Sequence, residues 1–187
     1  MGANIEGVGT DMLTITGVGE LHSANIKIIP DRVEAGTFLM AGALNGTIKV
    51  SNVIPGHLKR VTDKLIDAGC TLQIDKNSIS ISSPSIIKSV DMTTAVYPGF
   101  PTDLQAQWVA LMSLSESSAI VTDTVYHDRF SHIPELSRLG ANIKVDKNTA
   151  FIRGVKQLVG APVMSTDIRA SASLIIAALA ASGKTEI

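Results

Sequence analysis

After Pro30, mostly apolar residues recur at the spacing of a helix. The repeating positions are Val33, Thr37, Met40 and Leu44. A spacing of three or four residues predicts a helix that packs one face on a core, and an Asp or Thr just before it is typical of a helix N-cap. The short segment 47–53 that follows is predicted as a strand.

A second helix and a β-hairpin follow that strand. Residues 58–69 (LKRVTDKLIDAG) are predicted to form a helix that ends at Gly69, because glycine tolerates the left-handed backbone of a helix C-cap. The alternating segments CTLQID and SISIS are joined by Lys76 and Asn77, a two-residue turn in which Asn tolerates a positive φ. A leading strand, LTITG at 13–17, completes the predicted unit.

The same order of elements occurs twice in full and a third time in part. Residues 29–46 (IPDRVEAGTFLMAGALNG) align with 100–117 (FPTDLQAQWVALMSLSES), and no gap is needed as far as the hairpin KVDKNTAFI. The second unit therefore has its own strand at 119–125 and its own helix at 130–140, which ends at a glycine. Residues 164–179 (MSTDIRASASLIIAAL) align with the start of the second unit, and the chain ends before a second helix or hairpin.

The repeats define the expected fold class, an α/β domain. Its units lie at about 29–83, 91–154 and 158–187, and the second and third have the leading strands DMTTAVY and APVMSTD. Each β-α-β-α-β-β unit should form a four-stranded sheet with two helices on one face. Helices that are apolar all round, such as SASLIIAALAA, need helical neighbours. We therefore expect helices inside, sheets outside, and helix N-termini that face a common cleft.

Composition narrows the class of function. The chain has 187 residues, 45% hydrophobic and 18% charged, with a formal net charge of −1. A nucleic-acid or anionic-membrane surface needs an excess of Lys and Arg, so neither partner is expected. The apolar segment 170–181 is too short to cross a bilayer, and the first residues lack a signal-peptide pattern. A single cysteine, Cys70, suits a reducing compartment. We expect a cytoplasmic protein.

Metal and cofactor chemistry is not expected from the sequence. His22, His57 and His132 show no metal-ligand spacing with one another or with Cys70. The GVGT segment lacks the spacing of a nucleotide-binding loop. We therefore expect no metal ion and no cofactor at the site.

Five segments carry a family resemblance along the whole chain. They are GVGTDMLTITGV, IIPDRVEAGTFL, YPGFPTDLQAQ, HDRFSHIPELSRLGA and TDIRASASL. In this order they resemble the UDP-N-acetylglucosamine enolpyruvyl (carboxyvinyl) transferases, which catalyse the first committed step of peptidoglycan synthesis and so serve cell-wall growth and division. The sister enzymes that act on shikimate phosphate share the fold but usually lack PDRVEAGTF and FPTDLQAQ.

The resemblance implies two inside-out α/β barrel domains with the active site between them. Residues 1–28 would be the end of the first domain and the crossover, and residues 29–187 a truncated second domain. The family's catalytic cysteine loop would lie outside this chain, and Cys70 is interpreted as a small buried hydrophobe. We therefore expect part of an active site that is inactive without the remainder of the enzyme.

The implied reaction transfers enolpyruvate from phosphoenolpyruvate to the 3-hydroxyl of UDP-N-acetylglucosamine and releases phosphate. It needs a general base for the hydroxyl and cationic side chains for the anionic groups. The resemblance assigns Asp103, in FPTDLQAQ, as the base. From the residues alone, a helix N-cap is the favoured interpretation of Asp103. The aligned residues are Asp167 in unit three and Arg32 in unit one.

The resemblance implies four further substrate-binding residues. They are Val125, whose backbone would contact the UDP-sugar, Arg129, Asp167 and Arg169. Without the resemblance, Val125 is the end of a strand and the arginines are surface salt-bridge residues whose partners would be Asp128 and Asp167. Arg169 has additional support, since the helix N-terminus it opens attracts anions.

Two expectations concern the chain as a whole. The alternative function is a non-catalytic isolated domain, or a degenerate paralogue that binds a nucleotide sugar or a protein partner. In either case the incomplete third unit leaves apolar helix surface open, so we expect self-association.

His127 lies where the family often has an acid, and its role stays open.

Overall fold

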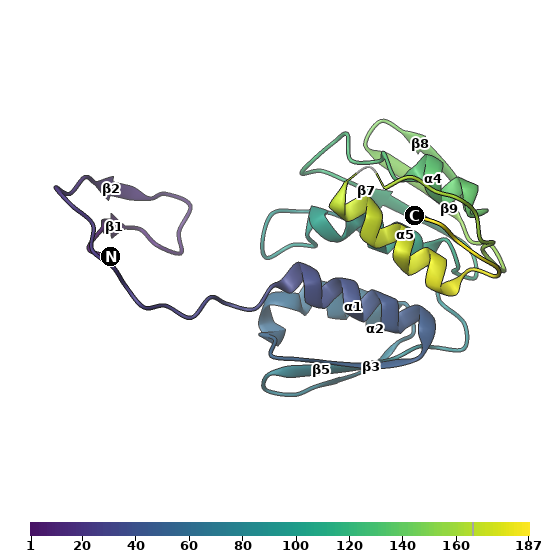
Figure 1. Ribbon diagram of the computed structural model, residues 1–187, viewed down its shortest axis with the longest axis horizontal. Coiled ribbons are helices and arrows are strands. Elements are labelled where there is room, and N and C mark those ends of the chain that lie inside the picture. The colour runs from purple at the N-terminus through teal and green to yellow at the C-terminus, as the bar shows by residue number, and fades with distance from the viewer. Residues whose placement is uncertain (166) are drawn as a thin grey trace.

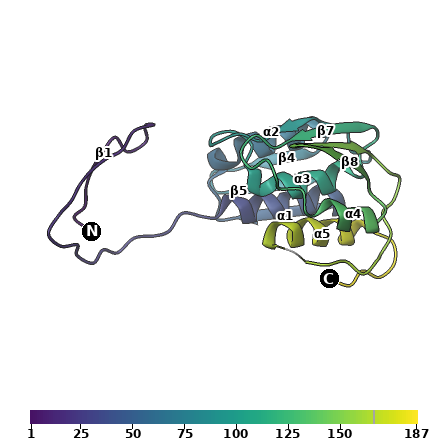
Figure 2. The same cartoon turned by 90° about the horizontal axis from the view of Figure 1, so that it is seen from above.

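The computed structural model describes residues 1–165 and 167–187. From about residue 30 onward the chain forms one body in which helices lie between two sheets (Figures 1 and 2). The N-terminal part forms a separate hairpin of β1 (Asn4–Glu6) and β2 (Thr14–Thr16), and an extended segment joins it to the body. Residues 1–29 are all exposed.

This hairpin corrects the leading strand predicted for the first unit. The LTITG segment does form a strand, but β2 pairs with β1 and does not enter the first unit's sheet. Antiparallel pairing with a nearby segment needs only a short connection, whereas pairing with the sheet would order a much longer one.

The first unit otherwise follows the predicted order. It consists of α1 (Arg32–Asn45), β3 (Thr47–Ser51), a 3-10 turn η1 (Pro55–Leu58), α2 (Lys59–Asp67), β4 (Thr71–Ile74) and β5 (Ser78–Ser82). The sheet has three antiparallel strands in the order β3-β5-β4. The predicted strand at 47–53 is therefore correct in type and ends two residues earlier.

The second unit has the predicted four-stranded sheet. Its elements are β6 (Met92–Thr93), η2 (Thr102–Leu104), α3 (Gln105–Met112), β7 (Ser118–Thr122), α4 (Ile133–Arg138), β8 (Asn142–Asp146) and β9 (Thr149–Arg153). The strand order is β6-β7-β9-β8, and only the leading strand β6 pairs in parallel, with β7. The leading strand DMTTAVY is thus confirmed over two residues.

The third unit contains the predicted helix without its leading strand. Helix α5 spans Ile168–Ala180. The APVMSTD segment forms only an isolated bridge between Pro162 and Glu186, with another between Val159 and Ser182 nearby. Among the described residues, segment 161–165 pairs only with the residues around Glu186, so the predicted strand joins no sheet there. Thr166, which belongs to the same prediction, lies outside the described residues.

Helix ends and turns confirm one backbone prediction and correct another. Gly69 and Gly140 follow α2 and α4 with φ of 97° and 91°, as expected for left-handed caps. In the two hairpins, however, neither Asn77 nor Asn148 has the predicted positive φ, and in the second hairpin the positive φ of 53° falls on Lys147. The Asn148 side chain instead donates a hydrogen bond to the carbonyl of Asp123 at 2.9 Å, and this contact fixes its conformation.

Helix α3 is the centre of the core. All eight of its residues are buried, and it packs against both α1 and α5. The helices therefore lie inside and the sheets outside, as predicted (Figure 1). Cys70 is buried at 5% exposure, and burial raises the pKa of its thiol to about 11, in agreement with its interpretation as a small hydrophobe.

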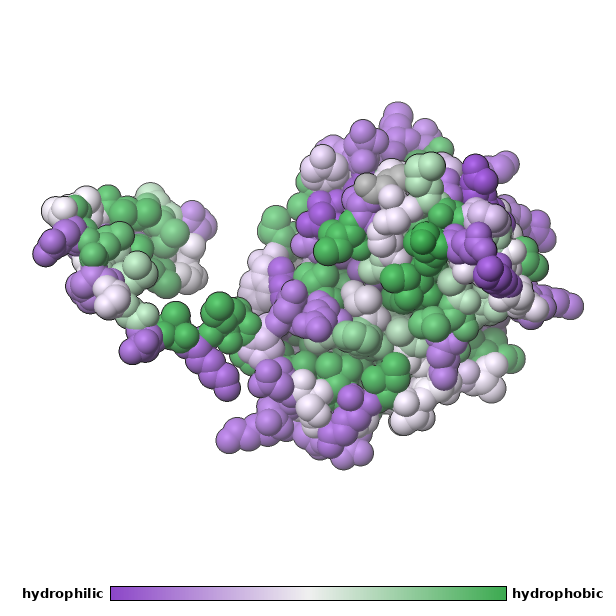
Figure 3. All heavy atoms as spheres, in the orientation of Figure 1, coloured by the Kyte–Doolittle hydropathy of each residue, from purple (hydrophilic) through white to green (hydrophobic). Residues whose placement is uncertain are grey.

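One face of α1 and α5 remains open. Exposed fractions are 52% for Phe38, 49% for Ile175 and 61% for Leu179, and apolar side chains gather over these helices in Figure 3. This is the open apolar surface expected from the incomplete third unit. Among the described residues, the helices are too short or too polar to span a bilayer.

Candidate active site

The N-terminal ends of α1 and α5 meet the start of α3 around one cavity. The cavity has a volume of about 360 Å³ and is lined by Asp31, Glu34, Phe38, Asp103, Gln107 and Arg169, among others. Asp31 caps α1 by accepting a hydrogen bond from the N–H of Val33 at 2.7 Å. Helix N-termini carry partial positive charge, so this end of the helices favours anionic ligands.

Asp103 lies in η2, and its carboxylate is not a helix cap. No side-chain cap bond is present at η2. Instead, Oδ1 of Asp103 accepts hydrogen bonds from Nη1 of Arg129 at 2.9 Å and from Nε of Arg169 at 2.6 Å. The N-cap interpretation is therefore wrong for Asp103, because two guanidinium groups hold the oxygen that a cap would use. Within the described part of the chain, Oδ2 has no hydrogen bond, and the side chain is 32% exposed.

Both arginines that the sequence singled out meet at this carboxylate. Within 4.0 Å they pair with Asp103 and, among described residues, with neither Asp128 nor Asp167. The Arg129 side chain is 19% exposed, and its guanidinium lies 4.8 Å from the centre of the Tyr126 ring. Each guanidinium has five N–H donors, so both keep donors for a ligand while they hold Asp103.

Asp167 caps the helix that carries Arg169. Its Oδ1 accepts from the N–H groups of Arg169 and Ala170 at 2.8 and 3.1 Å, and Ser131 donates to Oδ2 at 3.5 Å. Burial acts to raise the pKa of Asp167, but the backbone hydrogen bonds outweigh it and the pKa lies below its ordinary value. The carboxylate therefore fixes the start of α5, and substrate binding by Asp167 stays a prediction.

Val125 follows β7 in an exposed loop. Val125 is 42% exposed, and its backbone N–H donates a hydrogen bond to Oδ1 of Asp123 at 3.0 Å. The backbone contact with a sugar that the resemblance implies must therefore use the carbonyl oxygen, since the N–H is already bonded. The contact itself stays a prediction.

Two polar residues of this region, Asp123 and Gln107, were not predicted from the sequence. Asp123 is fully buried and accepts hydrogen bonds from Thr94 and Thr102 at 2.7 and 2.6 Å. Gln107 is 1% exposed and donates to Thr37 at 3.1 Å, and its Oε1 has no partner in the described structure. The signal that could have found Asp123 is its place just after β7, where strand ends hold functional side chains.

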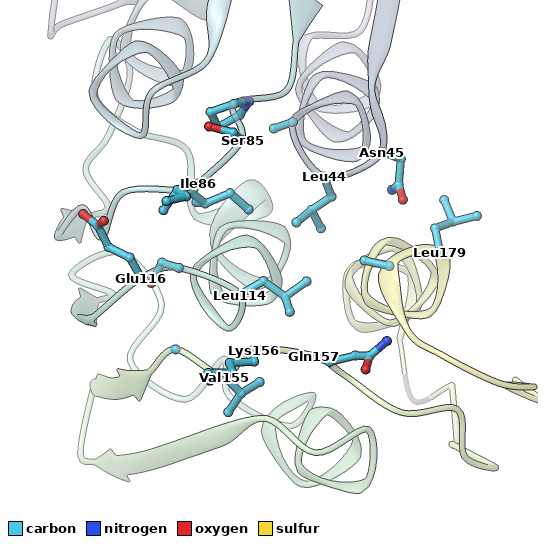
Figure 4. A pocket seen from close by; sticks show the side chains of 16 residues that line it. Leu44, Asn45, Ser85, Ile86, Leu114, Glu116, Val155, Lys156, Gln157 and Leu179 are labelled. Atoms are coloured by element: carbon cyan, nitrogen blue, oxygen red, sulfur yellow. The ribbon is translucent and has the colours of Figure 1, made fainter.

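A larger cavity lies at the opposite end of the same helices. It has a volume of about 680 Å³, and Figure 4 shows Leu44, Leu114 and Leu179 around it with Glu116 and Lys156. It is formed by the C-terminal ends of α1 and α5 and the segment after α3, and helix C-termini carry partial negative charge. It contains none of the predicted site residues, so the smaller cavity at the N-termini is the better site for a phosphate-bearing ligand.

The described residues contain no group of three or more His, Cys, Asp or Glu side chains placed to hold a metal ion. The donors and acceptors that converge on the smaller cavity are guanidinium, carboxylate and amide groups. Such groups can bind a phosphate or carboxylate and accept a proton from a hydroxyl.

Comparison with known proteins assigns the chain to a family. The family model described as EPSP synthase (3-phosphoshikimate 1-carboxyvinyltransferase) matches residues 1–187. A protein of Chlorobium chlorochromatii named UDP-N-acetylglucosamine 1-carboxyvinyltransferase is 50% identical over 100% of this chain, which spans 44% of that relative. A protein of the same name from Trichormus variabilis is 51% identical, again over 100% of this chain and 42% of the relative.

Solved structures agree on the fold. The enolpyruvyl transferase NikO from Streptomyces tendae matches with a TM-score of 0.79 and 26% identity, covering 96% of this chain and 44% of that one. EPSP synthase from Acinetobacter baumannii matches with a TM-score of 0.63 and 17% identity, covering 86% of this chain and 39% of the other, and at that identity shows the fold alone. The chain thus spans less than half the length of these relatives, and it belongs to the EPSP synthase family of enolpyruvyl transferases.

Proposed function

We propose that this chain is part of an enzyme that transfers enolpyruvate from phosphoenolpyruvate to the 3-hydroxyl of UDP-N-acetylglucosamine and releases phosphate. The observation that supports it most is the cluster in which Asp103 accepts hydrogen bonds from Arg129 and Arg169 beside a cavity at helix N-termini. The names of the relatives about 50% identical to this chain support the same choice of substrate. The reaction is the first committed step of peptidoglycan synthesis.

In the proposed mechanism Asp103 is the general base. Its Oδ2 takes the proton from the 3-hydroxyl as the hydroxyl oxygen forms a bond to C2 of phosphoenolpyruvate, and C3 of phosphoenolpyruvate takes a proton from a general acid that the rest of the longer polypeptide would supply. A C3 proton of the resulting adduct then passes to a base as the C2–O bond to phosphate breaks, and the double bond is restored. An alcohol is a weak nucleophile, so a positioned carboxylate near its proton accelerates the addition by orders of magnitude.

Arg129 and Arg169 bind the anionic groups in this proposal. In the unliganded chain both are ion-paired with Asp103. A phosphate or carboxylate that enters the cavity would accept hydrogen bonds from their remaining N–H donors. These hydrogen bonds would strengthen as charge develops on the leaving phosphate. Val125 would contact the UDP-sugar through its backbone carbonyl, and Asp167 would keep Arg169 in place and approach the substrate from the start of α5.

The remaining groups of the active site would come from a longer polypeptide. The chain spans 44% of the Chlorobium relative, and its open face over α1 and α5 needs a cover. We interpret residues 1–28 as the end of a first domain with the crossover, and residues 29–187 as part of a second. The 187-residue chain alone is then inactive, and the longer enzyme acts in the cytoplasm.

The test is phosphate release from phosphoenolpyruvate in the presence and absence of UDP-N-acetylglucosamine, with the full-length enzyme that contains these residues. We expect sugar-dependent release by the wild type and a loss of at least about a thousandfold in kcat for Asp103→Ala. Asp63→Ala, which removes an exposed carboxylate paired with Lys59, is the matched control and should keep full activity. A loss of less than about tenfold for Asp103→Ala would remove Asp103 from the role of base.

A further inference from the structure

Asp123 is a carboxylate with no exposure and no cation beside it in the described structure. It accepts four hydrogen bonds, from the hydroxyls of Thr94 and Thr102 and from the N–H groups of Val125 and Tyr126. Burying a charge without a counter-ion is costly unless hydrogen bonds compensate it. Burial alone would raise the pKa of Asp123, but these four bonds outweigh it and hold the pKa below its ordinary value.

These bonds join the two segments that form the candidate site. Oδ2 of Asp123 accepts from Thr102 at 2.6 Å, and Thr102 directly precedes Asp103. Oδ1 accepts from Val125 at 3.0 Å and Tyr126 at 2.8 Å, in the loop that leads to Arg129. One buried side chain thus holds both the turn with the proposed base and the loop with the proposed sugar contact.

The direction of the hydrogen bonds also orients Arg129. A threonine hydroxyl has a single proton, and Thr102 donates it to Asp123. The hydroxyl oxygen of Thr102 can then only accept a hydrogen bond from Arg129, and Nη1 of Arg129 donates to it at 3.1 Å. The same Nη1 donates to Asp103 at 2.9 Å. Asp123 therefore fixes, through Thr102, the position from which Arg129 reaches Asp103.

We propose that Asp123 is a positioning residue for the transferase reaction. It sets the spacing between Asp103, Arg129 and the Val125 carbonyl without touching substrate, because it is fully buried. The expected effect of Asp123 on the reaction rate rests on the proposed function. Its expected effect on the structure rests on the hydrogen bonds alone. A displacement of about 1 Å in a catalytic group can reduce the rate by roughly 100-fold.

The structural effect is measured on the 187-residue chain without substrate. Asp123→Asn keeps the side-chain shape and removes the charge. We expect the Val125 and Tyr126 amides to exchange hydrogen roughly tenfold faster or more, because a charge-assisted hydrogen bond is stronger than a neutral one. Asp91→Asn is the matched control, since Asp91 accepts from the N–H of Ile120 at 2.7 Å in the same sheet. It should leave both amides unchanged.

The kinetic effect is measured in the full-length enzyme. We expect Asp123→Asn to lower kcat/KM by roughly 100-fold with both kcat and the KM for UDP-N-acetylglucosamine affected, and Asp91→Asn to have no effect. Thr102→Val removes the hydrogen bonds of the Thr102 hydroxyl to Asp123 and Arg129 but leaves those of the Val125 and Tyr126 amides. It should lower kcat while the Val125 amide keeps its exchange rate. This second variant decides the question if Asp123→Asn does not fold.

Two results separate the failure of this inference from the failure of the proposed function. Amide exchange and kcat/KM within about twofold of wild type in Asp123→Asn would overturn the positioning role, because the hydrogen bonds would then not set the geometry. A wild-type enzyme without sugar-dependent phosphate release would instead refute the proposed function. The amide exchange of Val125 and Tyr126 would still decide whether Asp123 holds the loop.

Discussion

His132 provides a test of the fold through pH. It is 2% exposed at the start of α4, its ring stacks on Phe130 with centroids 6.2 Å apart, and its Nε2 has no hydrogen-bond partner in the described structure. Burial lowers the pKa of His132 from 6.5 to about 4, against a smaller opposing effect of the nearby Asp167 carboxylate. The folded chain therefore holds a neutral ring that takes up a proton readily only after unfolding.

The sign and size of the effect follow from this shift. Above pH 6.5 both states of the chain hold a neutral ring, and the full stability is present. As the pH falls from 6.5 toward 4 the unfolded state binds the proton first, so the free energy of unfolding falls by about 1.4 kcal/mol per pH unit. At pH 5 the loss is roughly 2 kcal/mol. Asp123 and Asp167 have pKa values below 3.8 and lose their contributions only at lower pH.

The assay is urea unfolding of wild type and His132→Leu at pH 7 and pH 5. The wild type should lose roughly 2 kcal/mol more than His132→Leu over this interval, whatever the variant's stability at pH 7. His127→Leu, a change in an exposed loop, is the control and should retain the wild-type loss. Equal losses in wild type and His132→Leu would refute the account of a buried neutral ring.

Two further predictions concern packing and the open face. A Cβ on Gly154 would lie 1.8 Å from the carbonyl oxygen of Ser115, so Gly154→Ala should lower the free energy of unfolding by about 3 kcal/mol in urea unfolding. The control is Gly56→Ala, because a Cβ on Gly56 would have no other atom within 4 Å. It should change the free energy of unfolding by less than about 1 kcal/mol. The exposed apolar face should make the 187-residue chain self-associate, and Leu179→Lys should weaken the association in sedimentation velocity. A wild-type chain that sediments as a monomer at all concentrations would contradict this prediction.

The repeat was sufficient to predict the helices and most strands, because local periodicity sets them. Helices α1, α3 and α5 begin within a few residues of the predicted positions, and Gly69 and Gly140 end α2 and α4. The leading strand of unit one forms but does not join the predicted sheet, and that of unit three does not form, because their pairing depends on contacts far apart in the sequence. The Lys147 turn was wrong for a similar reason, since the Asn148 side chain bonds to the distant Asp123.

The candidate site was predicted by resemblance more than by pattern. Asp103 and Asp167 align in the repeat and look alike in sequence, yet only Asp167 caps a helix while Asp103 pairs with two arginines. From η2 the Asp103 side chain meets Arg129 of its own unit and Arg169 of the third unit. Asp123 was missed because a single acid after a strand resembles an ordinary turn residue, and its four donors come together only in the folded chain.

The most direct test of the account is the structure of the full-length enzyme with UDP-N-acetylglucosamine bound. We predict that Oδ2 of Asp103 lies within hydrogen-bond distance of the sugar's 3-hydroxyl oxygen, about 2.6–3.2 Å, while Arg129 and Arg169 face the phosphoenolpyruvate position. A bound sugar whose 3-hydroxyl points away from Asp103, or a sugar seated in the cavity around Leu44 and Leu179, would contradict it.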